Sequence, residues 1–263
     1  MSLDGKVAIV TGASRGIGKD IALALGKSGA AVVVAARTEQ IWDRRLPGTI
    51  YSVAEEIQKA GGKALPLKVD VSKEEEVNAM TQKTIDEFGR IDILVNNAAI
   101  LVPGGIRELQ IRHFDLIYRV DLKGPFLCIR ACLDQMIKQG QGWIINISSG
   151  GALYPGPGPY PEDARAGGAF YGMVKAGLER LSQGIAMELQ TYNISVNVLS
   201  PAGRIKTPGN LFAQTDPQGE IGPFEDAVEM GTATVWIAQQ EPKKFTGNIL
   251  FDKQMIQEYG IRR

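Results

Sequence analysis

Residues 7–18 read VAIVTGASRGIG, and this stretch decides the fold of the chain. The apolar run at 7–10 predicts a short buried strand, and residues 17–27 have the apolar spacing of a helix. Three glycines lie between or at the edges of these elements: Gly12, Gly16 and Gly18. Glycine lets a phosphate approach the backbone because no Cβ is in the way, and a helix start offers free N–H groups and a positive dipole end. The stretch therefore predicts a strand–turn–helix unit that binds a pyrophosphate, rather than a plain tight turn.

The alternation of strand-like and helix-like segments continues along the chain. Continuous β-branched and aliphatic runs predict strands at residues 7–10, 31–35, 64–69, 91–95, 143–147, 194–199 and 248–251. Helical spacing predicts helices at residues 17–27, 52–60, 73–88, 112–138, 169–189 and 225–239, with loops at 38–48 and 150–168. Buried strands separated by helices form a parallel sheet through right-handed crossovers. The prediction is an α/β fold: a single doubly wound (Rossmann) domain over residues 1–263, with a parallel seven-stranded sheet flanked by helices.

Charge and cysteine content narrow the possible partners. Lys and Arg together number 29, as do Asp and Glu, so no basic excess favours nucleic acid or an anionic membrane. No apolar run approaches the roughly 20 residues of a spanning helix. Cys128 and Cys132 share one helix face at i, i+4, which favours two reduced core residues over a disulfide. With no signal peptide in the sequence, these features predict a cytoplasmic protein.

One tyrosine is paired with a lysine at helical spacing. Of the seven tyrosines, only Tyr171 has a lysine four residues later, Lys175. Residues i and i+4 lie on one helix face, and a nearby ammonium stabilises a phenolate. Such a tyrosine can give a proton to a carbonyl oxygen or take one from an alcohol. Ser149 would hold that oxygen by a hydrogen bond, and Lys175 would also reach the ribose hydroxyls of a nucleotide.

These motifs, taken in order, resemble those of the short-chain dehydrogenase/reductase family. They are TGASRGIG at 11–18, Asp70-Val71 after the third strand, NNAA at 96–99, Ser149 after the fifth strand, and YGMVK at 171–175. The resemblance covers essentially the whole chain. GTIY at 48–51, AEEI at 54–57, GGKALP at 61–66 and FTGN at 245–248 make it closer to the hydroxysteroid dehydrogenase-like branch. It implies hydride transfer between a nicotinamide cofactor and a small carbonyl or alcohol substrate, with no metal.

The resemblance also assigns roles to individual residues. It implies a catalytic set of Ser149, Tyr171, Lys175 and, at the family's asparagine position, Asp121. It implies a cofactor-binding set of Gly12, Ser14, Arg15, Gly16, Ile17, Gly18, Arg37, Asp70, Val71, Asn97, Ala98, Tyr171, Lys175, Ile205 and Thr207. Within the latter, Asp70 and Val71 face the adenine, while Ile205 and Thr207 contact the nicotinamide carboxamide. The family places its serine second in a Ser-Ser pair, which favours Ser149 over Ser148. Its members form homodimers or homotetramers through two long helices.

Three stretches depart from the family pattern. VDLKG at 120–124 carries Asp121 where the family has asparagine. The separation of Ser149 from Tyr171 is longer than usual, so residues 150–168 are interpreted as an inserted loop on the substrate side, or as an exposed decoration. PAGRIKT at 201–207 replaces the family's Pro-Gly and resembles enoyl reductases of the same superfamily.

The end of the second strand indicates the choice of cofactor. An acidic residue there would bind the ribose hydroxyls of NAD, but Ala36 occupies the position. Arg37 follows, and Arg15 lies inside the glycine motif. Two guanidiniums suit a 2′-phosphate, so NADP(H) is favoured over NAD(H). The alternative is that these arginines pair with Glu39 or Asp43.

Three functions remain open from sequence. The leading hypothesis is an alcohol dehydrogenase or ketone reductase. Enoyl reduction is suggested by residues 201–207, and a cofactor-binding regulator with little turnover is suggested by Asp121. A set of apolar side chains is expected to form the substrate pocket: Tyr154, Tyr160, Phe170, Leu211 and Phe212.

Overall fold

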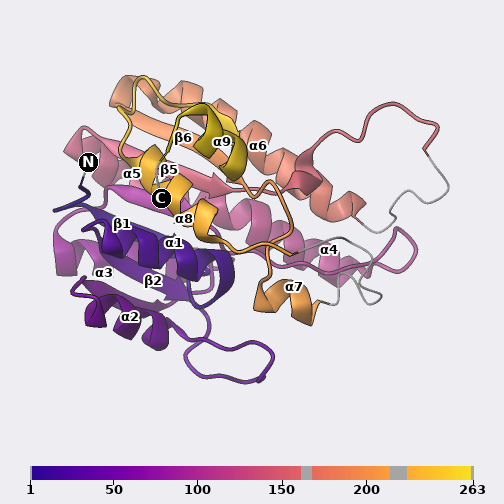
Figure 1. Ribbon diagram of the computed structural model, residues 1–263, viewed down its shortest axis with the longest axis horizontal. Helices are drawn as coiled ribbons and strands as arrows, with labels where there is room; N and C mark the ends of the chain where they lie inside the picture. The colour runs from indigo at the N-terminus through magenta and orange to yellow at the C-terminus, as the bar shows by residue number, and fades with distance from the viewer. Residues whose placement is uncertain (1, 161–167, 214–223, 262–263) are drawn as a thin grey trace.

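The computed structural model describes residues 2–160, 168–213 and 224–261. Its seven strands are β1 (Val7–Thr11), β2 (Ala31–Ala36), β3 (Ala64–Lys68), β4 (Ile93–Asn96), β5 (Gly142–Ile147), β6 (Ile194–Ser200) and β7 (Ile249–Phe251). All neighbouring strands pair in parallel, in the order β3-β2-β1-β4-β5-β6-β7. The predicted seven-stranded parallel sheet of a single Rossmann-like domain is confirmed (Figure 1).

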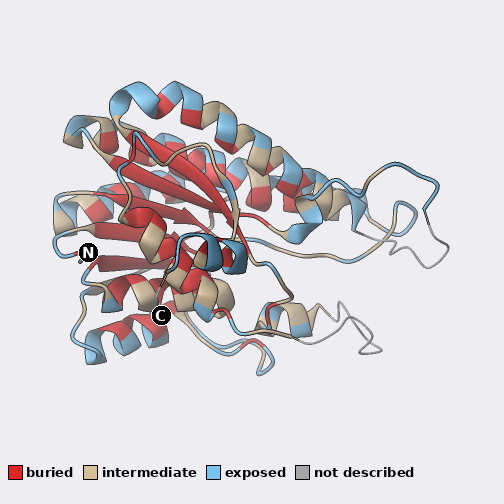
Figure 2. Ribbon diagram, turned by 45° about the horizontal axis from the view of Figure 1, so that its top comes forward, coloured by how far each residue is buried: buried red, intermediate tan, exposed pale blue. Residues whose placement is uncertain are grey.

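Helices cover both faces of the sheet. They are α1 (Gly16–Lys27), α2 (Ile50–Lys59), α3 (Glu74–Phe88), α4 (Ile111–Tyr118), α5 (Gly124–Gln139), α6 (Ala169–Leu189), α7 (Pro208–Phe212), α8 (Val228–Ala238) and α9 (Asp252–Glu258). Side chains of α1, α2 and α8 form one apolar core against the sheet, and those of α3, α5 and α6 form the other. The central strands are buried on both faces for this reason (Figure 2). Among the described residues, no helix is long and apolar enough to cross a membrane.

Several boundaries differ from the sequence predictions. The predicted helix 112–138 is α4 and α5 joined by a π-helical turn, Arg119–Lys123. The predicted helix 225–239 starts only at Val228, because the backbone of Glu225 pairs with Arg204 and Lys206 instead. The short helices α7 and α9 were not predicted. Both cysteines are buried and free, as predicted from their spacing.

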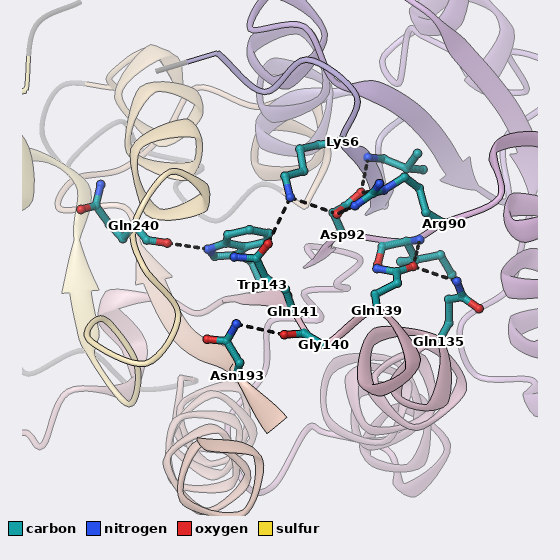
Figure 3. A network of polar contacts seen from close by, with 12 residues as sticks. Lys6, Arg90, Asp92, Gln135, Gln139, Gly140, Gln141, Trp143, Asn193 and Gln240 are labelled. Carbon is teal, nitrogen blue, oxygen red and sulfur yellow. Dashed lines mark hydrogen bonds and ion pairs between the residues drawn. The ribbon is translucent and has the colours of Figure 1, made fainter. Parts of the chain in front are cut away.

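A polar network ties together the amino ends of the central strands, away from the glycine motif. Asp92 is fully buried and accepts hydrogen bonds from Lys6, Arg90 and the backbone N–H of Val7. Lys6 also lies over the ring of Trp143, 4.7 Å from its centroid (Figure 3). The network joins the amino ends of β1, β4 and β5 and stabilises this end of the sheet. The carboxyl ends of the strands, on the opposite side, remain open for binding.

At the carboxyl ends of its strands, the sheet has a topological switch point between β1 and β4. The chain runs outward from β1 to β2 and β3, then returns to β4 and continues to β7 on the other side. In open α/β sheets, ligands bind in the crevice at such a reversal. The glycine motif follows β1 and the Asn97–Ala98 pair follows β4, so both lie at this crevice.

Candidate active site

The glycine motif is packed against the residues that follow β4. Thr11 Oγ1 accepts hydrogen bonds from the backbone N–H groups of Asn97 and Ala98, at 3.0 and 3.1 Å. Asn97 Nδ2 donates to the carbonyl of Thr11 at 2.9 Å. A Cβ at Gly12 would lie 2.8 Å from Ala98 Cα, and one at Gly18 would overlap Asn97 Nδ2. These two glycines are therefore required by the protein's own packing, in addition to the phosphate approach predicted from sequence.

The start of α1 is open for an anion. Arg15 is the N-cap residue with an extended backbone, and within the described residues no side chain caps the helix. No acidic residue occupies the first turn. The free N–H groups and the positive end of the helix dipole thus face the crevice, as a pyrophosphate requires. Ser14 is buried and Ile17 is partly buried beside them.

Two arginines lie near each other, Arg15 in the glycine motif and Arg37 directly after β2. Arg15 Nη2 donates to the carbonyl of Gly48 at 3.1 Å, but its buried Nε has no hydrogen-bond partner among the described residues. Burial and the positive charge of Arg37 lower the pKa of Arg15. No described ion pair joins either arginine to an acid, since Glu39 binds Lys68 and Tyr51 while Asp43 binds Arg45. The pair is suited to hold an anion.

Asp70 and Val71 follow β3, and Asp70 is within electrostatic reach of Arg37. Burial opposes ionisation of Asp70, but hydrogen bonds from Ser72 and the charge of Arg37 outweigh it and lower the pKa. Val71 is buried, and a Cβ at Gly124 of α5 would lie 2.9 Å from Val71 Cγ2. Both residues are therefore held in place from within the protein.

The first two turns of α6 carry the tyrosine–lysine pair. Lys175 is 3% exposed, and its Nζ donates to the carbonyl of Ile147 at 3.1 Å, at the end of β5. The same Nζ lies 5.7 Å from the centroid of the Tyr171 ring. Tyr171 itself remains partly exposed. The predicted i, i+4 pair thus has one buried cation and one accessible phenol.

Ser149 and Ser148 have different side-chain partners. Ser149 Oγ accepts from the backbone N–H of Gly151 at 3.1 Å, and a Cβ at Gly151 would lie 3.5 Å from Tyr171 Cδ1. Ser148 Oγ instead donates to Glu179 Oε1 at 2.7 Å. Glu179 lies one helical turn beyond Lys175 on α6, so it draws Ser148 away from the tyrosine. This side-chain bond was not predicted, because nothing in the local sequence places α6 against the end of β5.

Asp121 lies inside the π-helical turn, and its carboxylate points at Lys175. It is 0% exposed, and its Oδ1 accepts from the backbone N–H of Ile100 at 2.9 Å. Its Oδ2 lies 3.6 Å from Lys175 Nζ, an ion pair too long for a hydrogen bond. Burial raises the pKa of Asp121 to about 6, although the charge of Lys175 acts in the opposite direction. A carboxyl group that can carry a proton therefore lies beside Lys175.

The segment after β6 lies over the glycine motif. Ile205 is buried and bridges to Glu225. Thr207 Oγ1 accepts from the backbone N–H of Asn210 and so caps α7. A Cβ at Gly16 would lie 3.2 Å from Thr207 Cβ, so the threonine stands directly over the glycine loop. This arrangement brings the segment after β6 to the crevice.

The apolar side chains expected to form a substrate pocket are not gathered together. Phe170 packs against Phe114 of α4 with ring centroids 3.9 Å apart, whereas Phe212 packs against Trp42. Tyr154, Tyr160 and Leu211 are exposed. Residues 161–167 of the expected substrate-side loop lie outside the described residues. Phe114 is the residue that the sequence analysis missed, since α4 is distant in sequence from α6.

The parallel sheet and the uncapped start of α1 are typical of nucleotide-binding proteins of the Rossmann type. A family model described as short chain dehydrogenase matches residues 6–216. The chain is 37% identical over 262 residues to hydroxysteroid dehydrogenase-like protein 2 of Bos taurus. This match covers 99% of the present chain and 59% of the bovine protein. The Homo sapiens protein of the same name is 37% identical over 261 residues, covering 98% and 59%. The chain belongs to the short-chain dehydrogenase family, near the hydroxysteroid dehydrogenase-like branch.

Solved structures of the family have the same fold. A short chain dehydrogenase from Mycobacterium thermoresistibile superposes with a TM-score of 0.83 at 31% identity, over 99% of this chain and 89% of that one. A short-chain type dehydrogenase/reductase from Mycobacterium marinum gives 0.81 at 31% identity, over 95% and 94%. The chain spans 59% of the length of the curated relatives above, whereas it matches these structures over nearly their full length. Members of the family use a nicotinamide nucleotide, which the open α1 terminus and the arginine pair fit.

Proposed function

We propose that this protein interconverts a ketone and a secondary alcohol with NADP(H) as cofactor. The observation that carries the proposal is the arrangement of Tyr171 and Lys175 on α6, with a buried ammonium 5.7 Å from the phenol ring. Ser149 contacts the same corner through Gly151. When bound, the nicotinamide supplies or accepts the hydride, and the chain's own residues manage the proton.

Each catalytic side chain has a separate task in this proposal. Tyr171 gives its phenolic proton to the carbonyl oxygen in reduction, and takes the alcohol proton in oxidation. Lys175 stabilises the phenolate left behind, because its ammonium is fixed by the Ile147 carbonyl and by Asp121. The hydroxyl of Ser149 donates a hydrogen bond to the substrate oxygen. Glu179 accepts the hydrogen bond of the Ser148 hydroxyl, so Ser148 does not compete with Ser149 for the substrate oxygen.

The preference for NADP(H) rests on the arginines at the end of β2. Cationic donors favour a 2′-phosphate, and a carboxylate at the end of the second strand would repel it. Arg15 and Arg37 are close enough for one charge to lower the pKa of the other, and Ala36 offers no acid. Glu39 is neutralised by Lys68 at 2.8 Å. An anion between the arginines would relieve their mutual repulsion.

Assembly, location and the inserted loop extend the proposal. Exposed apolar residues lie on α5 and α6, including Phe126, Met173 and Met187. They support a homodimer or homotetramer packed through these helices. The two free, buried cysteines support a reducing compartment such as the cytoplasm. Residues 150–168 join Ser149 to α6, so we assign this segment to the substrate side.

The decisive experiment is a turnover assay with purified protein. NADPH and NADH oxidation would be followed with bulky cyclic ketones, simple ketones and enones, and NADP⁺ reduction with the matching alcohols. Turnover of ketones with NADPH supports the proposal. Turnover of enones alone would establish enoyl reduction instead. Tight NADPH binding with no turnover on any substrate would favour a regulator, the function that the Asp121 substitution suggests.

A further inference from the structure

The loop after β2 and the helix after β6 touch, although their strands are far apart. In the strand order, β1, β4 and β5 separate β2 from β6. At about 4.8 Å per strand, four steps place β2 and β6 roughly 19 Å apart. Residues 38–48 and α7 both lie beyond the carboxyl ends of the strands, where they are side by side (Figures 1 and 2). A contact between them must therefore cross the crevice at the switch point.

That contact is made by the ring of Phe212 at the end of α7. The ring of Trp42 meets it edge-on, with centroids 6.0 Å apart and an interplanar angle of 77°. The guanidinium of Arg45 lies over the same ring, with Cζ 4.4 Å from the centroid. Asp43 fixes this guanidinium by accepting from Nε at 3.1 Å and Nη2 at 2.7 Å. One phenylalanine is thus held by two side chains of the loop.

Both partners of this contact are also anchored to the glycine motif. At the base of the loop, the carbonyl of Gly48 accepts from Arg15, and a Cβ at Gly48 would overlap the carbonyl of Ser14. At the start of α7, Thr207 stands over Gly16. The contacts therefore form a closed circuit from the glycine loop through residues 38–48 to Phe212 and back through Thr207. The circuit starts and ends at residues 14–16, at the N-terminus of α1.

We propose that Trp42, Arg45 and Phe212 form a clasp that retains the cofactor by closing over its pyrophosphate. The clasp rests on the proposed function, because it acts on the dinucleotide expected at α1. These are positioning residues rather than catalytic ones: they hold α7, and with it Thr207, against the glycine loop. Release of the dinucleotide then requires Phe212 to leave Trp42 and Arg45. Residues 38–48 make the connection between β2 and α2 longer than a minimal βα turn. Retention of the cofactor therefore depends on residues outside the shared family motifs.

The test measures dissociation of the cofactor without turnover. NADPH, or NADH if the protein binds only that nucleotide, would be displaced from wild type, Trp42→Ala, Phe212→Ala and the double variant in stopped-flow fluorescence. Aromatic and cation–π contacts of this kind predict dissociation about three- to tenfold faster in each single variant. Phe212→Ala removes both contacts of its ring, and Trp42→Ala removes one of the same two. The double variant should therefore be no faster than Phe212→Ala by more than about twofold.

Ile41→Ala is the matched control. Ile41 is an exposed apolar neighbour of Trp42 in the same loop, with no described ring contact to Phe212. Its dissociation rate should equal that of wild type, and the nucleotide-free unfolding temperature of all variants should stay within about 2 °C of wild type. Unchanged dissociation in the Trp42 and Phe212 variants, or fully multiplicative effects in the double variant, would overturn the clasp alone. A wild type that binds neither nucleotide would overturn the proposed function as well.

Discussion

Asp121 Oδ2 lies 3.6 Å from Lys175 Nζ in a site where both side chains are buried. The carboxylate balances a cation whose described hydrogen-bond partner is the carbonyl of Ile147. Its second oxygen, Oδ1, accepts from Ile100 in a way that an asparagine oxygen would equally allow. The substitution therefore keeps the local fold of the π-helical turn while adding a titratable group next to the lysine.

The first prediction concerns turnover of Asp121→Asn. The backbone of the turn and the Oδ1 contact are retained, so turnover at pH 8 should change by less than about tenfold, equivalent to about 1.4 kcal/mol. The pKa of Asp121 is raised to about 6, so its carboxylate gains a proton as the pH falls through that value. The ratio of variant to wild-type kcat should change between about pH 5 and 7 and stay flat above. Both rates would be measured across this range with saturating cofactor and substrate.

Two outcomes would contradict this interpretation of Asp121. A constant ratio from pH 5 to pH 8 would show that the carboxyl does not affect catalysis by titration. An inactive wild type whose turnover rises by orders of magnitude in Asp121→Asn would show that the aspartate disables the proton relay, as the regulator hypothesis requires.

The second prediction concerns stability and follows from the same group. Burial raises the pKa of Asp121 from 3.8 to about 6 in the folded protein, which therefore binds this proton more tightly than the unfolded chain. The resulting stabilisation is full below about pH 4 and is lost as the pH rises through about 6. Relative to Asp121→Asn, wild type should lose about 1–3 kcal/mol of unfolding free energy over that window. Urea unfolding of both proteins at pH 4 to 7 measures it, and parallel curves would refute it.

The third prediction concerns Tyr171→Phe. The variant keeps the ring beside Lys175 but has no phenolic proton, so turnover should fall by about 10²–10⁴. The dissociation constant of NADPH should stay within a few-fold of wild type, as measured by fluorescence titration. Tyr192→Phe is the control, since Tyr192 is 47% exposed, lies just before the amino end of β6 and has no lysine four residues later. Near-normal turnover in Tyr171→Phe would remove the tyrosine from the mechanism.

The fourth prediction concerns Arg37→Ala. Loss of one charge-assisted contact to a 2′-phosphate should weaken NADPH binding by about 1.5–3 kcal/mol and leave NADH binding almost unchanged. Arg37 is preferred to Arg15 for this test because Arg15 also bonds to the loop at Gly48. Arg44→Ala, an exposed arginine of the same loop, is the control for net charge. Equal weakening of both nucleotides would show that Arg37 does not distinguish them.

Much of this protein was determined by local sequence. The buried strand runs, the glycine motif on the first βα turn and the spacing of Tyr171 and Lys175 each depend on residues close together in the chain. Periodicity and steric demand act over a few residues, so the sequence predicts the parallel sheet and the tyrosine–lysine pair. It does not predict the π-helical turn around Asp121, because the geometry of this turn depends on packing between α5, α6 and the end of β4.

The tertiary structure decided which distant residues meet. It separates Ser149 from Ser148 through Glu179, sets Asp121 against Lys175, and joins Phe114 to Phe170. It also brings Trp42 to Phe212, although three strands separate β2 from β6 in the sheet. These contacts link segments that follow different strands, and the order of strands in the sheet fixes which segments are neighbours. Sequence periodicity reports whether a strand is buried, whereas the crossovers determine what its end will touch.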